Sequence, residues 1–368
     1  MITQAEYFGR CYDSRTVHLL VTLVGLMTLL PFLAVQIAGA AKILSGVVDR
    51  QISYDAAVLI CVASIWAYVH FGGARAVVWT DGLQGIIVAG ILGISAWLFV
   101  DWAGGVSSGL DRVARAMPEK LVFNRENGPQ FLDQMLSWTF AVFLFPHIFQ
   151  RLFMARAPET IRRTSIISGA IMLVMMACIL VMAIFATAEL HGTLDDPDEL
   201  IVAMYRQHWR EGGVILMIAV LALSMSTIDS VVLSVASLAT RDTLRGQLRI
   251  DLSAATELSL ARWISLALLA LASLVALQGI GRDAIAPWVT LGASFCTLLL
   301  WPLIGSTWAR GTAAAAIAGM AMGFVAICLA RFTHLCEGLP FGFATCGFLV
   351  GGTCFLGTCL LQRQPVRS

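Results

Sequence analysis

Long runs of residues without a charged side chain are the feature that most limits how this chain can fold. The run from Thr16 to Ala41 contains no Lys, Arg, Asp or Glu, and a helix needs roughly 20 apolar residues to cross a bilayer. A backbone inside lipid finds no water, so each such run has to be helical. Charged residues make up only 13% of the 368 residues, against about 25% in soluble domains. The sequence therefore predicts an all-α polytopic membrane protein.

Apolar segments of this kind recur along the whole chain, so we expect about ten transmembrane helices in a single membrane domain. Their approximate bounds are 17–41, 55–71, 82–103, 131–150, 164–188, 212–240, 258–280, 285–308, 311–330 and 338–361.

The charged residues between these segments alternate in sign from loop to loop. Basic loops follow the fourth, sixth and eighth segments, and their arginines, with those of the tail, are Arg151, Arg156, Arg162, Arg163, Arg241, Arg245, Arg249, Arg310, Arg363 and Arg367. The loop after the fifth segment is acidic and holds Glu189, Asp195, Asp196, Asp198 and Glu199. Since basic loops stay on the cytoplasmic side, we expect both termini in the cytoplasm and the 189–211 loop outside. The stretch from Arg151 to Arg163 is interpreted as charge that sets this topology.

Four stretches of the sequence carry a resemblance to a known family. They are Glu6 to Arg10 with Ser14-Arg15; Tyr68, Gly72-Gly73, Arg75-Ala76-Val77-Val78-Trp79-Thr80-Asp81 and Gln84; Trp138 with Pro146-His147-Ile148 and Gln150-Arg151; and Ser224-Met225-Ser226-Thr227-Ile228-Asp229-Ser230 with Thr240-Arg241-Asp242. In this order they resemble the sodium/solute symporter family, which includes proline, pantothenate, iodide and sodium/glucose carriers. The second and fourth stretches together make the resemblance specific.

The resemblance implies a leucine-transporter-type fold of two inverted five-helix repeats, with sites at broken helices near the middle of the membrane. On this map residues 1–103 are the remainder of the first repeat, 104–308 are the second repeat with its preceding loop, and 309–368 are peripheral helices. The implied function is sodium-coupled uptake of a small organic solute across the plasma membrane, with Na⁺ as the coupling ion and no other cofactor.

Ser226 and Thr227 are the candidate sodium ligands. Hard cations take oxygen ligands, and two consecutive hydroxyls can join the carbonyl of Leu223 one turn earlier. The resemblance assigns this motif to half of a sodium site. The alternative is that the hydroxyls bond to the carbonyls four residues back or pack against a neighbouring helix.

Asp81, Asp229 and Ser230 form a candidate second cation site. A carboxylate inside a span is costly unless it faces water, an ion or a partner, and Ser230 lies one turn after Ser226. Two structural alternatives remain open. Asp229 can hydrogen-bond a helix terminus, and Thr80 or Asp81 can cap the N-terminus of the third segment.

The candidate solute pocket consists of Gln36, Trp138, Val142 and Pro146. Proline kinks a helix because it removes a backbone hydrogen bond, which suits an interrupted helix beside a solute. Val142 stands where proline carriers place an aromatic residue, which argues against proline as the substrate. The alternatives are that Trp138 belongs to the aromatic belt at the membrane interface and that Gln36 bridges two helices.

Several functions are disfavoured by what the sequence lacks. It shows no Ser-His-Asp set, paired carboxylates or phosphate loop, no metal-ligand spacing other than for Na⁺, and no basic patch for nucleic acid. We therefore expect no enzyme and no nucleic-acid partner, but a lipid bilayer, a sodium ion and a small solute. A non-transporting sensor-like or accessory protein on the same fold is the alternative.

The resemblance makes the first segment the third core helix, so three helices of the family have no counterpart. The interrupted first helix of the family supplies carbonyls to the sodium site, and lipid cannot replace them. We therefore expect a truncated gene or gene model, and no sodium-driven uptake by this chain alone. Uptake into vesicles that follows an imposed sodium gradient and stops when the gradient is collapsed would contradict this expectation.

Overall fold

The structure is a computed structural model in which residues 3–118, 128–153, 155, 157–190, 193–194, 196–238, 240, 253–280, 285–307, 311–333 and 341–362 are described. These residues form helices and the connections between them, with no β-strand among them. In chain order the helices are α1 (Gln4–Cys11), α2 (Arg15–Val47), α3 (Tyr54–Trp102), α4 (Val106–Ala116), α5 (Gly128–Ala141), η2 (Val142–Leu144), α6 (Pro146–Leu152), α7 (Pro158–Glu189), η3 (Pro197–Glu199), α8 (Leu200–His208), α9 (Gly212–Ser237), α10 (Ala254–Val275), η5 (Ala276–Ile280), α11 (Ala286–Thr297), α12 (Leu300–Thr307), α13 (Ala313–Phe332) and α14 (Phe343–Leu361).

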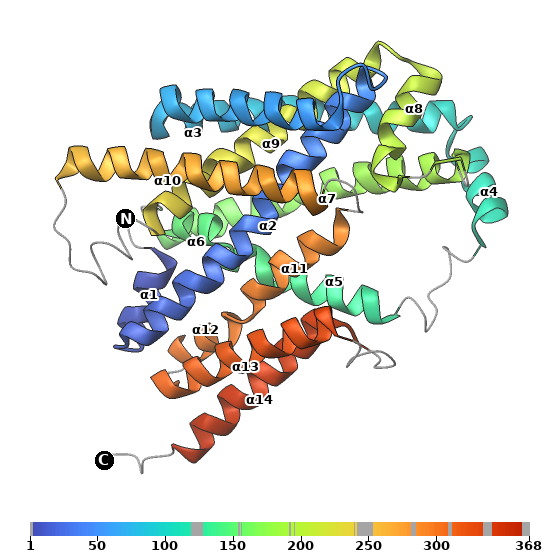
Figure 1. The fold of residues 1–368 in the computed structure, drawn as a ribbon. Helices are drawn as coiled ribbons and strands as arrows, with labels where there is room; N and C mark the ends of the chain where they lie inside the picture. Colours follow the sequence, from blue (N-terminus) through green and yellow to red (C-terminus); the bar gives the residue numbers. More distant parts are fainter. Residues whose placement is uncertain are drawn as a thin grey trace.

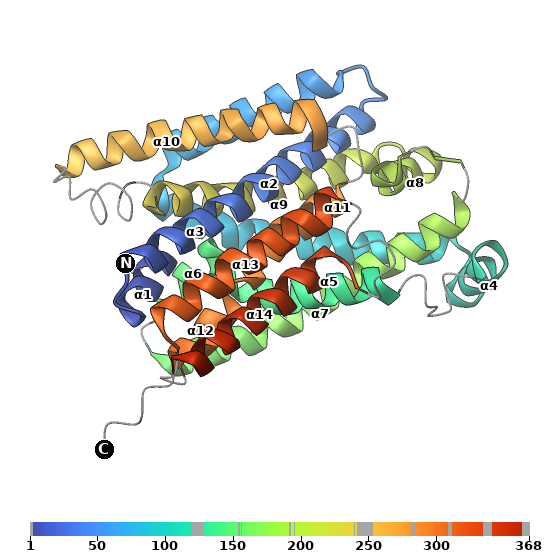
Figure 2. The same ribbon diagram turned by 60° about the horizontal axis from the view of Figure 1, so that its bottom comes forward.

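The membrane spans follow the predicted segments closely. In the described part of the chain, eight helical stretches are long and apolar enough to cross a membrane, and Tyr54–Ala67 and Phe131–Leu144 are shorter apolar helices. Together they match the ten predicted segments in order, which confirms the all-α polytopic class. The segments 55–71 and 82–103 share the helical element α3, whose two ends lie at the same end of the bundle: α3 begins just after the Arg50–Glu199 ion pair, and Trp102 stacks on His208 of α8. A straight helix of this length would separate its ends by about 70 Å, so the two segments are separate spans (Figures 1 and 2).

Helix α2 is the central helix of the bundle, and it crosses the molecule between α1, α3, α9, α10 and α11 (Figures 1 and 2). In its most apolar stretch 56% of the residues are buried, against 17% in α7. The exposed apolar side chains of α7, among them Leu173 and Val174, are the surface that lipid would cover. The core of the protein therefore lies along α2, and α7 lies at its periphery.

Helices α13 and α14 pack closely through two Gly-xxx-Gly pairs, Gly319/Gly323 and Gly347/Gly351. A Cβ added to Gly319 would lie 3.0 Å from the carbonyl oxygen of Gly351, and one added to Gly323 would lie 2.9 Å from that of Gly347. Backbones this close leave no room for a side chain, so the glycines serve the packing of this helix pair.

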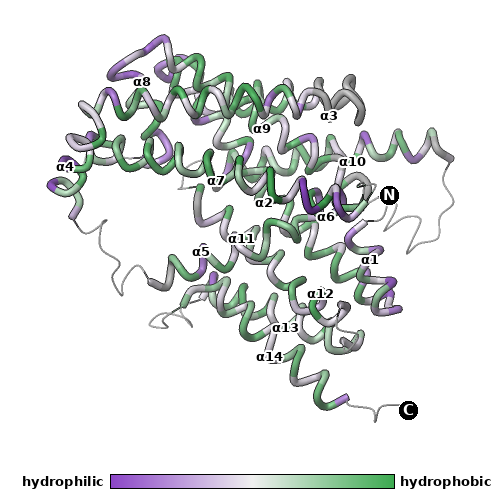
Figure 3. Tube along the Cα trace, turned by 180° about the vertical axis from the view of Figure 1, so that it is seen from behind, coloured by the Kyte–Doolittle hydropathy of each residue, from purple (hydrophilic) through white to green (hydrophobic). Residues whose placement is uncertain are grey.

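The loops gather at two opposite ends of the bundle. At one end Tyr12 donates a hydrogen bond from Oη to the carbonyl of Pro302 at 2.6 Å, which joins the start of α2 to α12. Helix α1 and the end of α14 lie at this end, whereas α4 and α8 lie at the other (Figures 1 and 2). Figure 3 shows apolar colour along the long helices and polar colour at α1, α4, α6 and α8.

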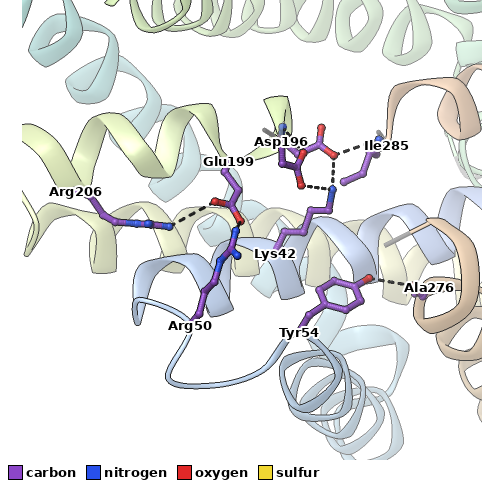
Figure 4. Close-up of polar contacts among 9 residues, drawn as sticks. Lys42, Arg50, Tyr54, Asp196, Glu199, Arg206, Ala276 and Ile285 are labelled. Carbon is purple, nitrogen blue, oxygen red and sulfur yellow. Dashed lines mark hydrogen bonds and ion pairs between the residues drawn. The ribbon is translucent and has the colours of Figure 1, made fainter. Parts of the chain in front are cut away.

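The buried side chain of Lys42 joins several elements at the α8 end of the bundle (Figure 4). Lys42 is near the end of α2, and its side chain is only 5% exposed. Its Nζ donates to Asp196 Oδ2 at 2.8 Å and to Asp198 Oδ2 at 2.7 Å. Asp198 Oδ2 also accepts from the backbone N–H of Ile285 at 3.2 Å, just before α11. The lysine thus joins α2, the predicted acidic loop and α11. Asp195 of that loop lies outside the described residues.

A second layer of ion pairs surrounds this lysine at the same end (Figure 4). Glu199 lies 2.8 Å from Arg50 and 3.7 Å from Arg206, and Arg206 lies 3.8 Å from Asp49. A Cβ added to Gly46 would lie 3.2 Å from Val202, so α2 and α8 are in close contact below these charges. The acidic loop is therefore docked on α2 by both charge and packing.

We predict that Lys42→Met lowers the free energy of unfolding by about 2 kcal/mol. This loss is smaller than the usual cost of breaking a buried ion pair, because Asp196 and Asp198 both keep some contact with water. Thermal unfolding of the purified protein in detergent measures the effect. Arg163→Met is the matched control, since Arg163 pairs with Glu159 at 3.1 Å but its side chain is 76% exposed, and such pairs contribute little. The double variant Lys42→Met/Asp198→Asn should regain part of the loss. Equal effects of the two single substitutions would contradict the prediction.

Candidate functional site

The predicted sodium ligands share one face of α9. Leu223, Ser226, Thr227 and Ser230 follow the spacing i, i+3, i+4 and i+7, which places them on a single stripe of a helix. Another face of the helix is buried in the core, where it packs against α2 and α3 through Ile228, Val231, Val232 and Val235. The stripe is more open, since Leu223 is 46% exposed and Ser226 and Thr227 are half-buried.

Thr227 makes the local hydrogen bond that the structural alternative anticipated. Its Oγ1 donates to the carbonyl oxygen of Leu223 at 3.0 Å. This bond uses the hydroxyl hydrogen and leaves lone pairs on both oxygens. The two oxygens are therefore adjacent acceptors on the same stripe, and Ser226 lies beside them. The arrangement is compatible with both interpretations, and the sodium role stays a prediction.

The candidate second cation site gathers residues from three helices. Arg151 of α6 donates from Nη2 to Asp81 Oδ2 of α3 at 3.1 Å and to the hydroxyl of Ser230 on α9. Ser230 Oγ also lies 3.4 Å from Asp229 Oδ1 and 3.1 Å from the carbonyl of Ser226. The structure thus brings Asp81 and Ser230 together through an arginine that the sequence analysis interpreted only as topology-setting charge.

Neither aspartate is fully satisfied within the described residues. Asp229 has no exposed surface, and its Oδ2 has no hydrogen-bond partner there. Asp81 Oδ1 is likewise buried without a partner. Thr80 and Asp81 lie within the residues assigned to α3, at the start of its second membrane-spanning stretch, and the alternative that one of them caps a helix stays a prediction. Asp229 Oδ1 accepts a hydrogen bond from Ser230 of its own helix. Among the described residues, Asp229 therefore makes no hydrogen bond to a helix terminus.

The predicted break in the fourth segment is present and lies immediately before Pro146. Helix α5 ends in η2, Phe145 has φ −59° and ψ 130°, and α6 begins with Pro146 at its first position. Proline fits there because the first turn needs no donor from its nitrogen. The released carbonyl of Leu144 accepts from Gln4 Nε2 at 2.7 Å. Gln4 is 1% exposed, so a side chain of α1 satisfies the break from inside the protein.

The break lies next to α2, and aromatic rings make part of this contact. The ring of Phe145 lies 5.0 Å from that of Phe32 and 5.5 Å from that of His147. Pro146 is buried, and a Cβ added to Gly25 of α2 would lie 3.2 Å from its Cγ. Gln36 is half-buried one turn after Phe32. Gln36 and Pro146 are therefore on the two elements that meet at the break.

Two other predicted pocket residues are less enclosed. Trp138 is 41% exposed on α5, a position that also suits the interface-belt alternative. Val142 is half-buried in η2. The side chains of 68–79, the second stretch of the resemblance up to Trp79, lie outside the described residues, as do Arg156, Arg241, Asp242, Arg245, Arg249, Arg310, Arg363 and Arg367.

Three side chains that shape these sites were given no role in a site from the sequence. Gln4 satisfies the break, Gln150 accepts from Ser234 Oγ at 3.1 Å and joins α6 to α9, and Arg151 bridges α3 and α9. A polar residue in an apolar run was the available signal for Gln150, but nothing in the sequence pairs it with Ser234. The contacts span 84 residues or more in the first two cases.

Comparison with known protein families matches residues 1–323 to the model described as the sodium:solute symporter family. The chain belongs to this family. The predicted class is thereby confirmed as that of sodium-coupled membrane transporters, which are not enzymes and use Na⁺ as the coupling ion with a small-molecule solute.

Individual relatives agree with this assignment. An uncharacterised symporter of Bacillus subtilis is 27% identical over 202 residues, which cover 53% of this chain and 41% of the relative. The sodium/proline symporter of Salmonella typhimurium is 25% identical over 390 residues, which cover 100% of this chain and 74% of the relative. The matched parts therefore span less than half of the first relative and about three quarters of the second.

The fold of this chain is similar to that of a solved structure. A Na⁺-coupled sialic acid symporter in a substrate-bound outward-open state matches with a TM-score of 0.77 over 98% of this chain and 77% of that chain. At 17% sequence identity the match establishes the fold alone.

Proposed function

We propose that the chain is the transport core of a sodium-coupled symporter for a small organic solute, with the coupling sodium held on the stripe of α9. The observation that carries the proposal is the pair of oxygens formed by Thr227 Oγ1 and the Leu223 carbonyl, 3.0 Å apart on a half-open face beside Ser226. A hard cation that binds there contacts three oxygens of one helix. Family membership favours transport over a sensor-like or accessory role, since the named relatives are symporters.

The solute would bind where the α5–α6 break meets α2, in the region of Gln36, Trp138, Val142 and Pro146. A break in a membrane helix frees polar backbone groups only where protein or a ligand satisfies them. Leu144 O is already bonded to Gln4, so the side chains around the break would make the remaining contacts. Asp81, Asp229 and Ser230 would hold a second cation about one helical turn after Ser226 and Thr227.

Ser226→Ala and Thr227→Ala should each raise the sodium concentration for half-saturation by about ten- to a hundredfold, because a lost bond to a charged group costs about 1.5–3 kcal/mol. The measurement is the sodium-dependent rise in the unfolding temperature of the purified protein. Choline chloride keeps the ionic strength constant during the titration.

Thr353→Ala is the matched control for this pair. Thr353 lies exposed on α14 and donates to the Leu349 carbonyl at 3.0 Å, the same local bond that Thr227 makes. Its removal should leave the sodium dependence unchanged. Sodium titrations of Ser226→Ala and Thr227→Ala that coincide with that of Thr353→Ala would identify these hydroxyls as packing residues only.

The same proposal gives the chain an orientation, with both termini in the cytoplasm and α8 outside. Helix α7 offers a test at its two ends, where Glu159 and Thr193 are both exposed. In a variant whose own cysteines are replaced by serine, a membrane-impermeant maleimide added to intact cells should label Thr193→Cys. It should leave Glu159→Cys unlabelled until the cells are permeabilised. The reverse pattern would invert the orientation.

A further inference from the structure

Arg151 lies where a second cation would bind. A single nitrogen of its guanidinium, Nη2, donates both to Asp81 Oδ2 at 3.1 Å and to Ser230 Oγ. These two oxygens belong to α3 and α9, so the guanidinium joins the two helices. We propose that Arg151 is a tethered cation that occupies the second cation site and competes there with a mobile monovalent cation such as Na⁺. The inference rests on the second cation site put forward under the proposed function.

The charges around Arg151 indicate a site for a cation rather than a closed ion pair. Arg151 pairs with Asp81, and a second carboxylate, that of Asp229, lies beside Ser230. Asp229 is completely buried, and its Oδ2 has no partner among the described residues. A buried carboxylate oxygen without a partner is costly. When the guanidinium leaves, two carboxylates and one hydroxyl remain, an all-oxygen set of the kind that hard cations prefer.

The arginine can leave this site without a rearrangement of the helices. Its side chain is 55% exposed, whereas that of Asp81 is 17% exposed, so the guanidinium reaches the buried oxygens from the solvent side. The backbone beside it is held in place, since Gln150 accepts a hydrogen bond from Ser234 on α9 at 3.1 Å. Exchange therefore requires only rotation of one long side chain.

This arrangement has a consequence for the transport cycle. Without a cation between them, the carboxylates of Asp81 and Asp229 would repel each other in a low-dielectric site. This repulsion would oppose the return of the empty carrier. A guanidinium that takes the place of the departing cation removes that cost. While Arg151 is bonded to Ser230, the other residues of the α9 stripe, Leu223, Ser226 and Thr227, remain for one sodium ion. The arginine thus sets how many cations bind at one time.

The first test measures binding of ²²Na⁺ to the purified full chain. Arg151→Gln should add a second class of sites, or lower the half-saturating sodium concentration about tenfold, because the competing charge is gone. The added binding should disappear in Arg151→Gln/Asp81→Asn, while Arg151→Lys should behave like the unmodified chain. Arg163→Gln is the matched control, since Arg163 is an exposed arginine paired with Glu159, and it should change nothing.

The second test uses the unmodified chain and covers the case in which Arg151→Gln fails to fold. Phenylglyoxal reacts with free guanidinium groups, and peptide mass spectrometry reports the rate at each arginine. Sodium should accelerate modification of Arg151 severalfold by displacing it from Asp81 and Ser230. Choline should have no such effect, and the rate at Arg163 should not depend on sodium.

The outcomes separate this inference from the proposed sodium site. Sodium binding that is lost in Ser226→Ala but unchanged in Arg151→Gln, with no effect of sodium on Arg151 modification, would overturn the inference and leave the α9 site intact. Binding that appears only in Arg151→Gln and depends on Asp81 would support the inference and contradict the α9 site. Absence of sodium binding in every variant would overturn both.

Discussion

The hydrogen bond from Gln4 to the carbonyl of Leu144 is the contact on which the arrangement around the α5–α6 break depends. A membrane helix that stops in mid-span releases backbone groups that lipid cannot satisfy. Here α1, which does not cross the membrane, supplies the missing donor at 2.7 Å from a side chain that is 1% exposed. The break can therefore exist inside the bundle, and with it the place where Phe145 and Pro146 meet α2.

The same constraint explains where the charged residues of the bundle lie. Lys42 is matched by Asp196 and Asp198 at one end, and Arg151 is matched by Asp81 near the other. Asp133 of α5 is buried as well, and it accepts hydrogen bonds from the backbone of Ala344 and Thr345 at the start of α14. In each case an ion pair or a buried carboxylate joins two or more elements of the bundle. Asp229 differs, since one of its oxygens has no partner among the described residues.

The candidate sites show which features can be predicted from residue patterns along the chain. The spacing of Leu223, Ser226, Thr227 and Ser230 places them on one stripe whatever the helix packs against. Pro146 marks a break because a proline removes a backbone hydrogen bond, but Pro31 lies inside α2 without ending it, so the structure decides which proline interrupts its helix. The role of Arg151 could not be derived in this way, because a basic residue after an apolar segment is what the rule for cytoplasmic loops predicts everywhere. Its partners Asp81 and Ser230 are 70 and 79 residues away.

The sequence by itself determined that this protein is a bundle of about ten membrane helices, because uncharged runs act locally. It marked Pro146 as a place where a helix can break. The resemblance of its motifs to the sodium/solute symporters agrees with the family match. Only the tertiary structure decided that α2 is central and that Gln4, Lys42 and Arg151 bind the partners they do. The reason is physical: lipid-facing and buried surfaces of membrane helices are both apolar, so periodicity does not tell which face meets which neighbour.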